Sequence, residues 1–196
     1  MHISTFAPVG TLYTSGGQRK YLTPAERTRF IAAAMVQPRP PVRTLCLMLA
    51  YTGCRISEAL DLFAGSIETH DAFVAIRSLK KRKKTIVIRQ VPLPHSVIEL
   101  INTTHRTSGP TDRLWPWSRS RAWQLVKMVM KQADIAAGLY ATPKGLRHGF
   151  GVHAIRSGIP INLVQRWMGH ASMTTTAIYL DVIGAEEREL AQRMWQ

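Results

Sequence analysis

The chain has 196 residues, of which 45% are hydrophobic, so it is long and apolar enough for one domain with a buried core and a small appendage. Lys and Arg together number 26 against 12 for Asp and Glu, and the formal charge of +14 favours a polyanionic partner such as DNA or RNA. The sequence contains no run of 18 or more apolar residues, so we expect no membrane span. The first ten residues lack the pattern of a signal peptide. We expect a cytoplasmic protein, associated with the nucleoid if it is bacterial.

The two cysteines, Cys46 and Cys54, are eight positions apart. On one helix that spacing separates them by roughly 12 Å, whereas a disulfide needs Cα atoms within about 7 Å. We therefore expect two free thiols in a reducing compartment. No group of Cys and His has the spacing of a zinc site, and we expect neither a metal nor a cofactor.

The first third of the chain predicts a loose arm followed by helices. Residues 1–20 are rich in Gly, Ser and Thr and predict a flexible N-terminal arm. Thr23-Pro24-Ala25-Glu26 is a capping box with proline at the first helical position, and it predicts a helix to about residue 36. Prolines at 38, 40 and 41 break that helix. A buried helix over 42–51 and a short helix over 57–63 are expected next.

The remainder predicts one hairpin among helices. Residues 72–79 and 85–91 alternate in polarity and predict two strands, joined by the basic tip Lys80-Lys81-Arg82-Lys83-Lys84. Further helices are predicted over 94–104, 118–133, 142–158 and 160–168, with a helix capped by Ser172 that carries Tyr179, and a terminal helix over 185–195. The fold class is mostly α (α+β), a helical bundle with a small antiparallel sheet or hairpin.

Three segments hold residues suited to phosphodiester chemistry. They are Thr52-Gly53-Cys54-Arg55-Ile56-Ser57-Glu58, then Lys144-Gly145-Leu146-Arg147, and finally Gly169-His170-Ala171-Ser172-Met173-Thr174-Thr175-Thr176-Ala177-Ile178-Tyr179. Breaking a phosphodiester without a metal needs a nucleophile, positive charge on the non-bridging oxygens, a proton for the leaving oxygen, and correct geometry. Taken singly, each residue has an ordinary reading as a surface ion pair, a solvated charge or a core side chain. The ordered set resembles the active site of the tyrosine recombinase (phage integrase) family.

The resemblance implies a role for each matching residue. Tyr179 would be the nucleophile that forms a covalent 3′-phosphotyrosine, with Arg55, Arg147 and His170 binding the phosphate. Lys144 stands where the family more often has histidine, and a charged lysine would act as a phosphate ligand rather than a base. We expect nearby cations to lower the pKa of the Tyr179 phenol from its ordinary value of about 10.

Other residues are assigned supporting roles by the same resemblance. Glu58 would support the site from behind Arg55. A hairpin lysine would protonate the leaving 5′ oxygen, and Lys80 is preferred with Lys81 as the alternative. The rest of the tip, Arg82, Lys83 and Lys84, is expected to contact DNA with Lys81. His148 and His153 do not match catalytic positions and are expected to be structural or near DNA.

The resemblance covers about residue 21 to the C-terminus. We predict an arm over 1–20, a catalytic domain over 21–183, and a C-terminal helix over 184–196 that docks on a neighbouring subunit or folds back. Most family members carry a helical domain before the catalytic one, so the chain resembles the short members such as the fimbrial phase-switch recombinases. Double-stranded DNA, a tetramer on paired DNA sites and an accessory DNA-binding protein are the implied partners.

Three alternatives compete with a recombinase. The chain could be a DNA-binding regulator that keeps the fold without turnover, or it could relax DNA as a type IB topoisomerase does, since that chemistry is shared. A nucleic-acid-binding module of another kind, carried by charge alone, leaves the ordered Arg, Lys-x-x-Arg, His, Tyr series unexplained.

Overall fold

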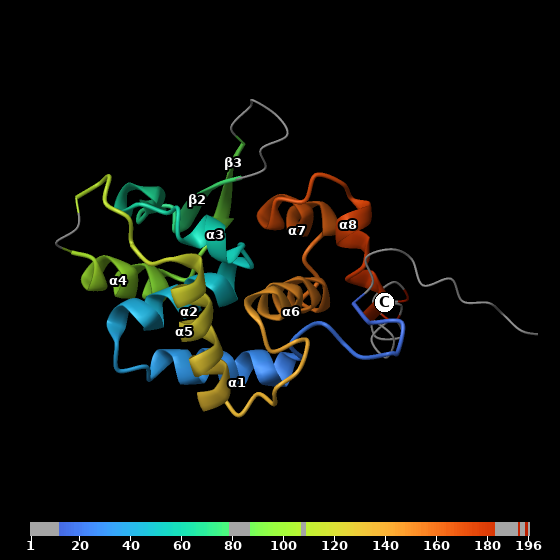
Figure 1. Ribbon diagram of the computed structural model, residues 1–196. Helices are drawn as coiled ribbons and strands as arrows, with labels where there is room; N and C mark the ends of the chain where they lie inside the picture. Colours follow the sequence, from blue (N-terminus) through green and yellow to red (C-terminus); the bar gives the residue numbers. More distant parts are fainter. Residues whose placement is uncertain (1–11, 79–86, 107–108, 183–191, 193–194, 196) are drawn as a thin grey trace, which may run out of the picture.

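The computed structural model describes residues 12–78, 87–106, 109–182, 192 and 195 (Figure 1). The basic tip Lys80–Lys84 and most of the helix predicted over 184–196 lie outside the described residues. Within the described residues, none of the helices combines the length and apolar character that crossing a bilayer requires. The predicted fold class is confirmed: helices dominate, with one small antiparallel sheet.

The first helical group forms the larger part of the core. Thr23 and Glu26 cap the first helix reciprocally, as predicted, and the second helix is buried along most of its length. Cys46 and Cys54 are buried free thiols in this group, as predicted. The helices are α1 (Pro24–Met35), α2 (Pro40–Thr52), α3 (Ile56–Ala59), α4 (His95–Thr104) and α5 (Arg119–Gln132).

The sheet lies against the third helix and at one end of the bundle (Figure 1). A 3-10 turn, η1 (Ala64–Ser66), leads into it. The described strands run antiparallel in the order β1 (Ile67–Glu68), β2 (Phe73–Arg77) and β3 (Ile88–Pro92). The predicted pairing of two strands is confirmed, and its register places Ile76 opposite Arg89.

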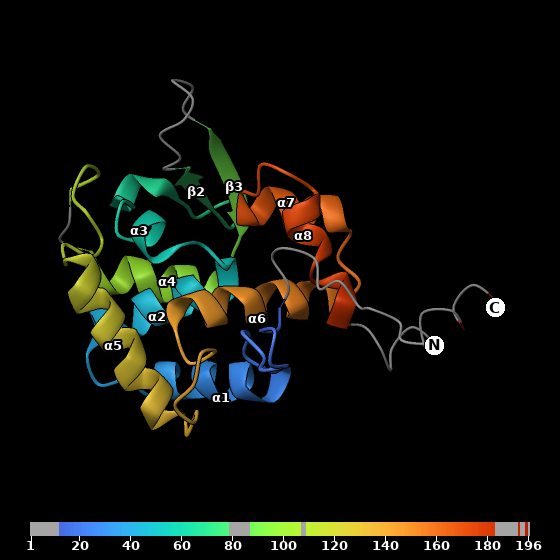
Figure 2. The same cartoon turned by 45° about the vertical axis from the view of Figure 1, so that its right-hand side comes forward.

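The sixth helix, α6 (Pro143–Arg156), joins the two halves of the molecule. It contacts α1, α2 and α5 on one side and α7 (Ile161–Met168) on the other, and Figure 2 shows it crossing between these groups. The short helices α8 (Thr174–Ala177) and η2 (Leu180–Val182) complete the second half. A second apolar cluster includes Phe150 of α6, Met168 of α7 and Tyr179, and it packs these parts of the chain together.

Three predicted elements differ from the structure. The helix predicted over 57–63 is a single turn, α3, and ends at Ala59. Tyr179 is not on a helix capped by Ser172, because α8 begins after Met173 and ends at Ala177, so the tyrosine lies in the link to η2. Leu12, placed in the expected arm, packs on the domain instead: it is 1% exposed and belongs to the cluster of Tyr179.

Candidate active site

The turn between α2 and α3 places Arg55. Gly53 ends α2 with a φ of 59°, and a Cβ there would lie 2.3 Å from the Phe150 ring, so both conformation and space require glycine. Thr52 Oγ1 donates to the Met48 carbonyl at 2.7 Å and accepts from the Cys54 N–H at 3.2 Å. The chain therefore turns after α2, and Arg55 is the N-cap residue of α3, with a side chain that remains 36% exposed.

Glu58 is a buried carboxylate that holds Arg55 in place. Its Oε2 accepts the Arg55 backbone N–H at 2.8 Å, and its Oε1 accepts Arg55 Nη1 at 2.9 Å. Burial raises the pKa of Glu58, but the charges and hydrogen bonds of Arg89 and Arg55 outweigh it, so the pKa lies below its ordinary value. Glu58 is therefore ionised and orients Arg55 as a charged partner.

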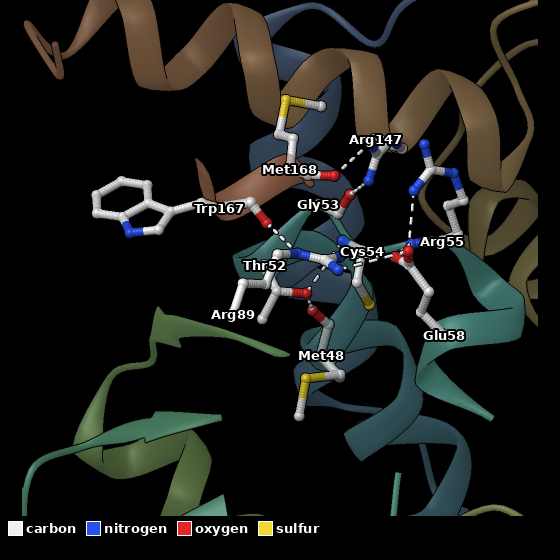
Figure 3. A network of polar contacts seen from close by, with 10 residues as sticks. All are labelled: Met48, Thr52, Gly53, Cys54, Arg55, Glu58, Arg89, Arg147, Trp167 and Met168. Carbon is white, nitrogen blue, oxygen red and sulfur yellow. Dashed lines mark hydrogen bonds and ion pairs between the residues drawn. The ribbon is translucent and has the colours of Figure 1, made fainter. Parts of the chain in front are cut away.

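Arg147, on α6, links the Arg55 turn to the end of α7. Its Nη1 donates to the Gly53 carbonyl and its Nη2 to the Met168 carbonyl, each at 2.6 Å (Figure 3). Burial, with a contribution from Arg55, lowers the pKa of Arg147 to about 10, so it stays charged at neutral pH. A guanidinium has five N–H donors, and these two bonds leave three for an anion.

His170 follows the residue that ends α7. Gly169 adopts a φ of 64° and closes the helix, so the chain turns toward α8. His170 Nδ1 and Thr176 Oγ1 lie 2.9 Å apart and share a hydrogen bond. The imidazole stacks on the Tyr179 ring with centroids 6.2 Å apart and an interplanar angle of 18°.

Tyr179 is buried, with 1% of its surface exposed. Its Oη lies 3.1 Å from His148 Nδ1, and its ring lies over Gly151, where a Cβ would be 2.5 Å from Cζ. Burial raises the pKa of Tyr179 to about 12, although Arg147 and Arg55 act to lower it. The cations act to lower this pKa, as expected, but loss of hydration outweighs their charge and the net shift is upward.

His148 is a contact that the sequence did not assign to the site. It was expected to be structural or near DNA, and it is the hydrogen-bond partner of Tyr179. Burial, together with the charges of Lys144 and Arg147, lowers the pKa of His148 to about 4, so the ring is neutral at pH 7. Lys144 is exposed at the start of α6. His153 lies further along α6, where burial and the nearby charge of Arg27 lower its pKa. Among the described residues it has no hydrogen bond to Tyr179.

Arg89, on β3, is the other site residue that sequence reasoning did not assign. Its Nη2 donates to Glu58 Oε2 at 2.7 Å. The strand alternation contained a signal. Arg89 is two residues before the buried Val91 and so lies on the same, inward face of β3, where a charged residue is unusual. Ile88, an apolar residue, is 63% exposed on the other face.

The site therefore combines strong positive charge with one buried carboxylate. Arg55, Arg89 and Arg147 contribute three positive charges and Glu58 one negative charge, a net of +2 in one network (Figure 3). Burial makes this excess unfavourable unless an anion enters. Arg147 acts against the burial that raises the pKa of Tyr179, and His170 stacks on the Tyr179 ring, so segments distant in the sequence bring these arginines close to a phenol.

The sequence matches the model of the phage integrase family over residues 20–185. The chain belongs to the phage integrase family. The tyrosine recombinase XerA of Pyrococcus furiosus is 31% identical over 157 residues, which cover 77% of this chain and 54% of the relative. Tyrosine recombinase XerD of Mycobacterium tuberculosis (H37Rv) is 32% identical over 147 residues, covering 70% of this chain and 46% of the relative. The chain thus spans about half the length of these curated relatives.

Solved structures of phage integrase family members share the fold. The crystal structure of XerA recombinase superposes with a TM-score of 0.72 at 26% identity, covering 89% of this chain and 64% of that one. The catalytic domain of bacteriophage HP1 integrase gives a TM-score of 0.63 at 19% identity, covering 82% of this chain and 86% of that one. Because its identity is low, the HP1 integrase structure supports the fold alone. The superposition covers most of that catalytic domain.

Proposed function

We propose that this chain contains the catalytic domain of a site-specific DNA recombinase that cleaves and rejoins DNA through a covalent 3′-phosphotyrosine, using neither metal nor ATP. The observation that carries the proposal is the convergence of Arg55, Arg147 and His170 on Tyr179 from separate segments. These side chains supply a nucleophile together with charge for the phosphate oxygens, which is most of what the reaction needs.

The reaction follows from these groups. The Tyr179 oxygen attacks phosphorus in line with the bond to the 5′ oxygen and loses its proton to solvent water. The bond to the 5′ oxygen breaks as the new O–P bond forms. Arg55 and Arg147 stabilise the negative charge that grows on the non-bridging oxygens, and His170 donates a hydrogen bond to one of them. The tyrosine ester keeps the energy of the phosphodiester, so a 5′ hydroxyl can reverse the reaction and rejoin a strand.

The leaving 5′ oxygen needs a proton, and we assign it to a lysine of the hairpin tip. Lys80 remains the first choice and Lys81 the second, with Lys81 to Lys84 contacting the DNA backbone. The antiparallel β2–β3 pair supports this assignment, because Arg77 and Ile88, the described residues on either side of the tip, are paired at one end of the sheet. Lys144, exposed beside the site at the start of α6, is proposed as a further phosphate ligand.

The structure corresponds to a resting arrangement in this proposal. The phenol oxygen is buried against His148, and its pKa of about 12 keeps it protonated. Cleavage therefore requires the segment after α8 to shift so that Tyr179 reaches phosphorus. DNA drives that shift if it binds the shifted arrangement more tightly than the resting one.

Duplex DNA is the proposed substrate. Relatives of the same fold are described as bound to DNA: XerH recombinase with its difH substrate, and the Tn1549 transposon integrase with transposon right end DNA. The formal charge of +14 supports the same partner. We further propose assembly as a tetramer on paired sites, with an accessory DNA-binding protein, in the nucleoid.

The experiment that tests the function traps the covalent intermediate. The protein is incubated with nicked duplexes that carry a randomised region, so that cleavage releases a short strand and prevents rejoining. Protein-linked DNA is recovered from SDS by potassium precipitation and sequenced, which gives the target site. Recovery that depends on Tyr179 and converges on one sequence supports a recombinase, and recovery that shows no sequence preference supports topoisomerase-like relaxation.

The burial of Tyr179 favours one second candidate, a DNA-binding regulator without turnover. A phenol that never leaves His148 would make the arginine network a phosphate-binding site only. That candidate predicts specific binding of a duplex in a gel-shift assay with no covalent adduct on the nicked form of the same duplex.

A further inference from the structure

Arg89 is the most buried arginine of the site, with 4% of its side chain exposed. It lies on β3, the strand that follows the hairpin tip, and its guanidinium reaches two other segments of the active site. A buried arginine with such reach either stabilises the fold or sets the geometry of the groups that it contacts. The contacts of Arg89 distinguish these roles.

The first contact is with Glu58, the carboxylate that orients Arg55. Arg89 Nη2 lies 2.7 Å from Oε2 and Nη1 lies 3.5 Å from Oε1, while Arg55 binds the same two oxygens through its backbone N–H and Nη1. Each oxygen of Glu58 is therefore shared between the two arginines. Arg89 fixes the plane of the carboxylate, and through it the direction of the Arg55 side chain (Figure 3).

The second contact is with the end of α7. Arg89 Nε donates to the Trp167 carbonyl at 2.7 Å, and Arg147 donates to the next carbonyl, that of Met168. Two arginines thus bind two successive carbonyls at a helix end, where the helix leaves acceptors unsatisfied and favours positive charge. The Arg89 guanidinium also packs on Gly169, where a Cβ would lie 3.0 Å from Cζ and Nη1. His170 is the next residue.

We propose that Arg89 is a positioning residue for the cleavage reaction, holding Arg55 through Glu58 and the His170 corner through the Trp167 carbonyl, so that both meet one phosphate. The inference rests on the proposed function. It assigns Arg89 an effect on the charge that develops on the non-bridging oxygens, although Arg89 itself does not touch the phosphate. A buried ion pair of purely structural value would have no such effect.

The test compares two substrates that differ only at the scissile phosphate. One nicked duplex carries the natural phosphate and the other a methylphosphonate, in which a methyl group replaces one non-bridging oxygen and removes the charge that Arg55 and Arg147 stabilise. Single-turnover cleavage is measured at saturating DNA for the wild type, Arg89→Met, Arg89→Lys and Arg55→Ala. Affinity for the duplex and thermal unfolding are measured for each protein.

We expect Arg89→Met to cleave the phosphate about 100-fold or more slowly than the wild type, by analogy with the removal of one donor to an oxyanion. Its affinity for DNA should stay within about threefold, since other cations supply most of the binding. On the methylphosphonate the gap should shrink to within about threefold, as for Arg55→Ala. An equal defect on both substrates would overturn the inference, as would a wild-type rate on the phosphate.

Arg89→Lys keeps the charge beside Glu58 and gives up the fork that reaches Trp167. It should show a smaller defect on the phosphate, again relieved on the methylphosphonate, and it decides the question if Arg89→Met does not fold. Arg77→Met is the matched control, because Arg77 lies on the neighbouring strand and pairs with Asp61 at 2.8 Å but is 49% exposed. It should cleave both substrates at the wild-type rate. If the wild type itself forms no adduct on either duplex, the proposed function fails instead.

Discussion

The ring nitrogen Nδ1 of His148 lies 3.1 Å from the hydroxyl oxygen of Tyr179, which makes a neutral imidazole the partner of the proposed nucleophile. Burial raises the pKa of the phenol to about 12 and lowers the pKa of the imidazole to about 4, so proton transfer from the phenol to the imidazole is unfavourable in this arrangement. Burial therefore keeps the phenol neutral in this arrangement, with His148 as its hydrogen-bond partner. His148 does not act as a base toward the nucleophile while both side chains stay buried.

Acid should destabilise the fold through His148. Its pKa is about 4 when folded and 6.5 ordinarily, so between those pH values the unfolded chain takes up a proton that the folded chain does not. The contribution to stability is fully present above about pH 6.5. It falls by up to roughly 3 kcal/mol as the pH drops to about 4.

Urea unfolding of the wild type and His148→Asn at pH 7 and pH 4 measures this effect. The variant should lose less stability between the two pH values. His105 and His153, whose pKa values burial also lowers, are present in both proteins, so their contributions cancel. Equal losses in the two proteins would show that His148 is not held neutral by the fold.

Replacing Gly151 should displace Tyr179 from its buried position. A Cβ at Gly151 would lie 2.5–2.7 Å from three atoms of the phenol ring, so Gly151→Ala cannot coexist with the ring where it is. The variant should lose about 1–3 kcal/mol by overpacking. Nitration of Tyr179 by tetranitromethane, followed by mass spectrometry, should become several-fold faster.

Gly149→Ala serves as the control, because it lies on the same helix and its Cβ would clash with the Leu22 carbonyl at 2.8 Å instead of the phenol. It should destabilise the protein and leave the nitration rate of Tyr179 unchanged under folding conditions. Similar nitration of both variants would argue that general loosening exposes the phenol.

Removing Glu58 should weaken the fold. Glu58→Ala leaves Arg89 buried without its carboxylate, and breaking one side of a buried pair costs about 3–5 kcal/mol. The midpoint of urea unfolding checks this value. Asp61→Ala breaks the exposed pairs with Arg77 and Arg113, and its loss should stay within about 1 kcal/mol. Equal losses would mean that the Glu58 pair is no more than a surface contact.

Arg147→Lys should reduce cleavage about 100-fold or more while keeping the charge. The guanidinium binds the Gly53 and Met168 carbonyls together and still presents donors, whereas an ammonium has three donors on one atom and cannot span both. Single-turnover cleavage at saturating DNA measures the effect. Arg113→Lys, at an arginine with 56% of its side chain exposed, should cleave normally.

Much of the fold could be predicted from local signals. The capping box at Thr23, the prolines before α2 and the glycines at 53 and 169 fix helix ends through backbone chemistry that neighbours in the chain determine. The sequence predicts Tyr179 on a helix capped by Ser172, yet α8 ends at Ala177. Packing of the ring beneath α6 decides that position, and no local pattern encodes it.

The site was only partly predictable for the same reason. Arg55, Arg147, His170 and Tyr179 were named from motif strings, which fix residue types and order. The roles of His148 and Arg89 depend on contacts between segments 31 residues apart in the chain, in each case with a residue of a motif. The net upward shift of the Tyr179 pKa could not be predicted, because composition reports the charge near a phenol but not how completely the fold removes water from it.

The central claim, that Tyr179 is a nucleophile toward DNA phosphorus, is tested most directly by trapping. The wild type and Tyr179→Phe are incubated with the nicked duplex selected above, and adducts are resolved by denaturing electrophoresis and mapped by mass spectrometry. We expect a protein–DNA adduct on the peptide that contains Tyr179 in the wild type, and none in Tyr179→Phe, which should still bind the duplex. Wild-type protein that binds the duplex without any adduct, or an adduct that persists in Tyr179→Phe, would contradict the account.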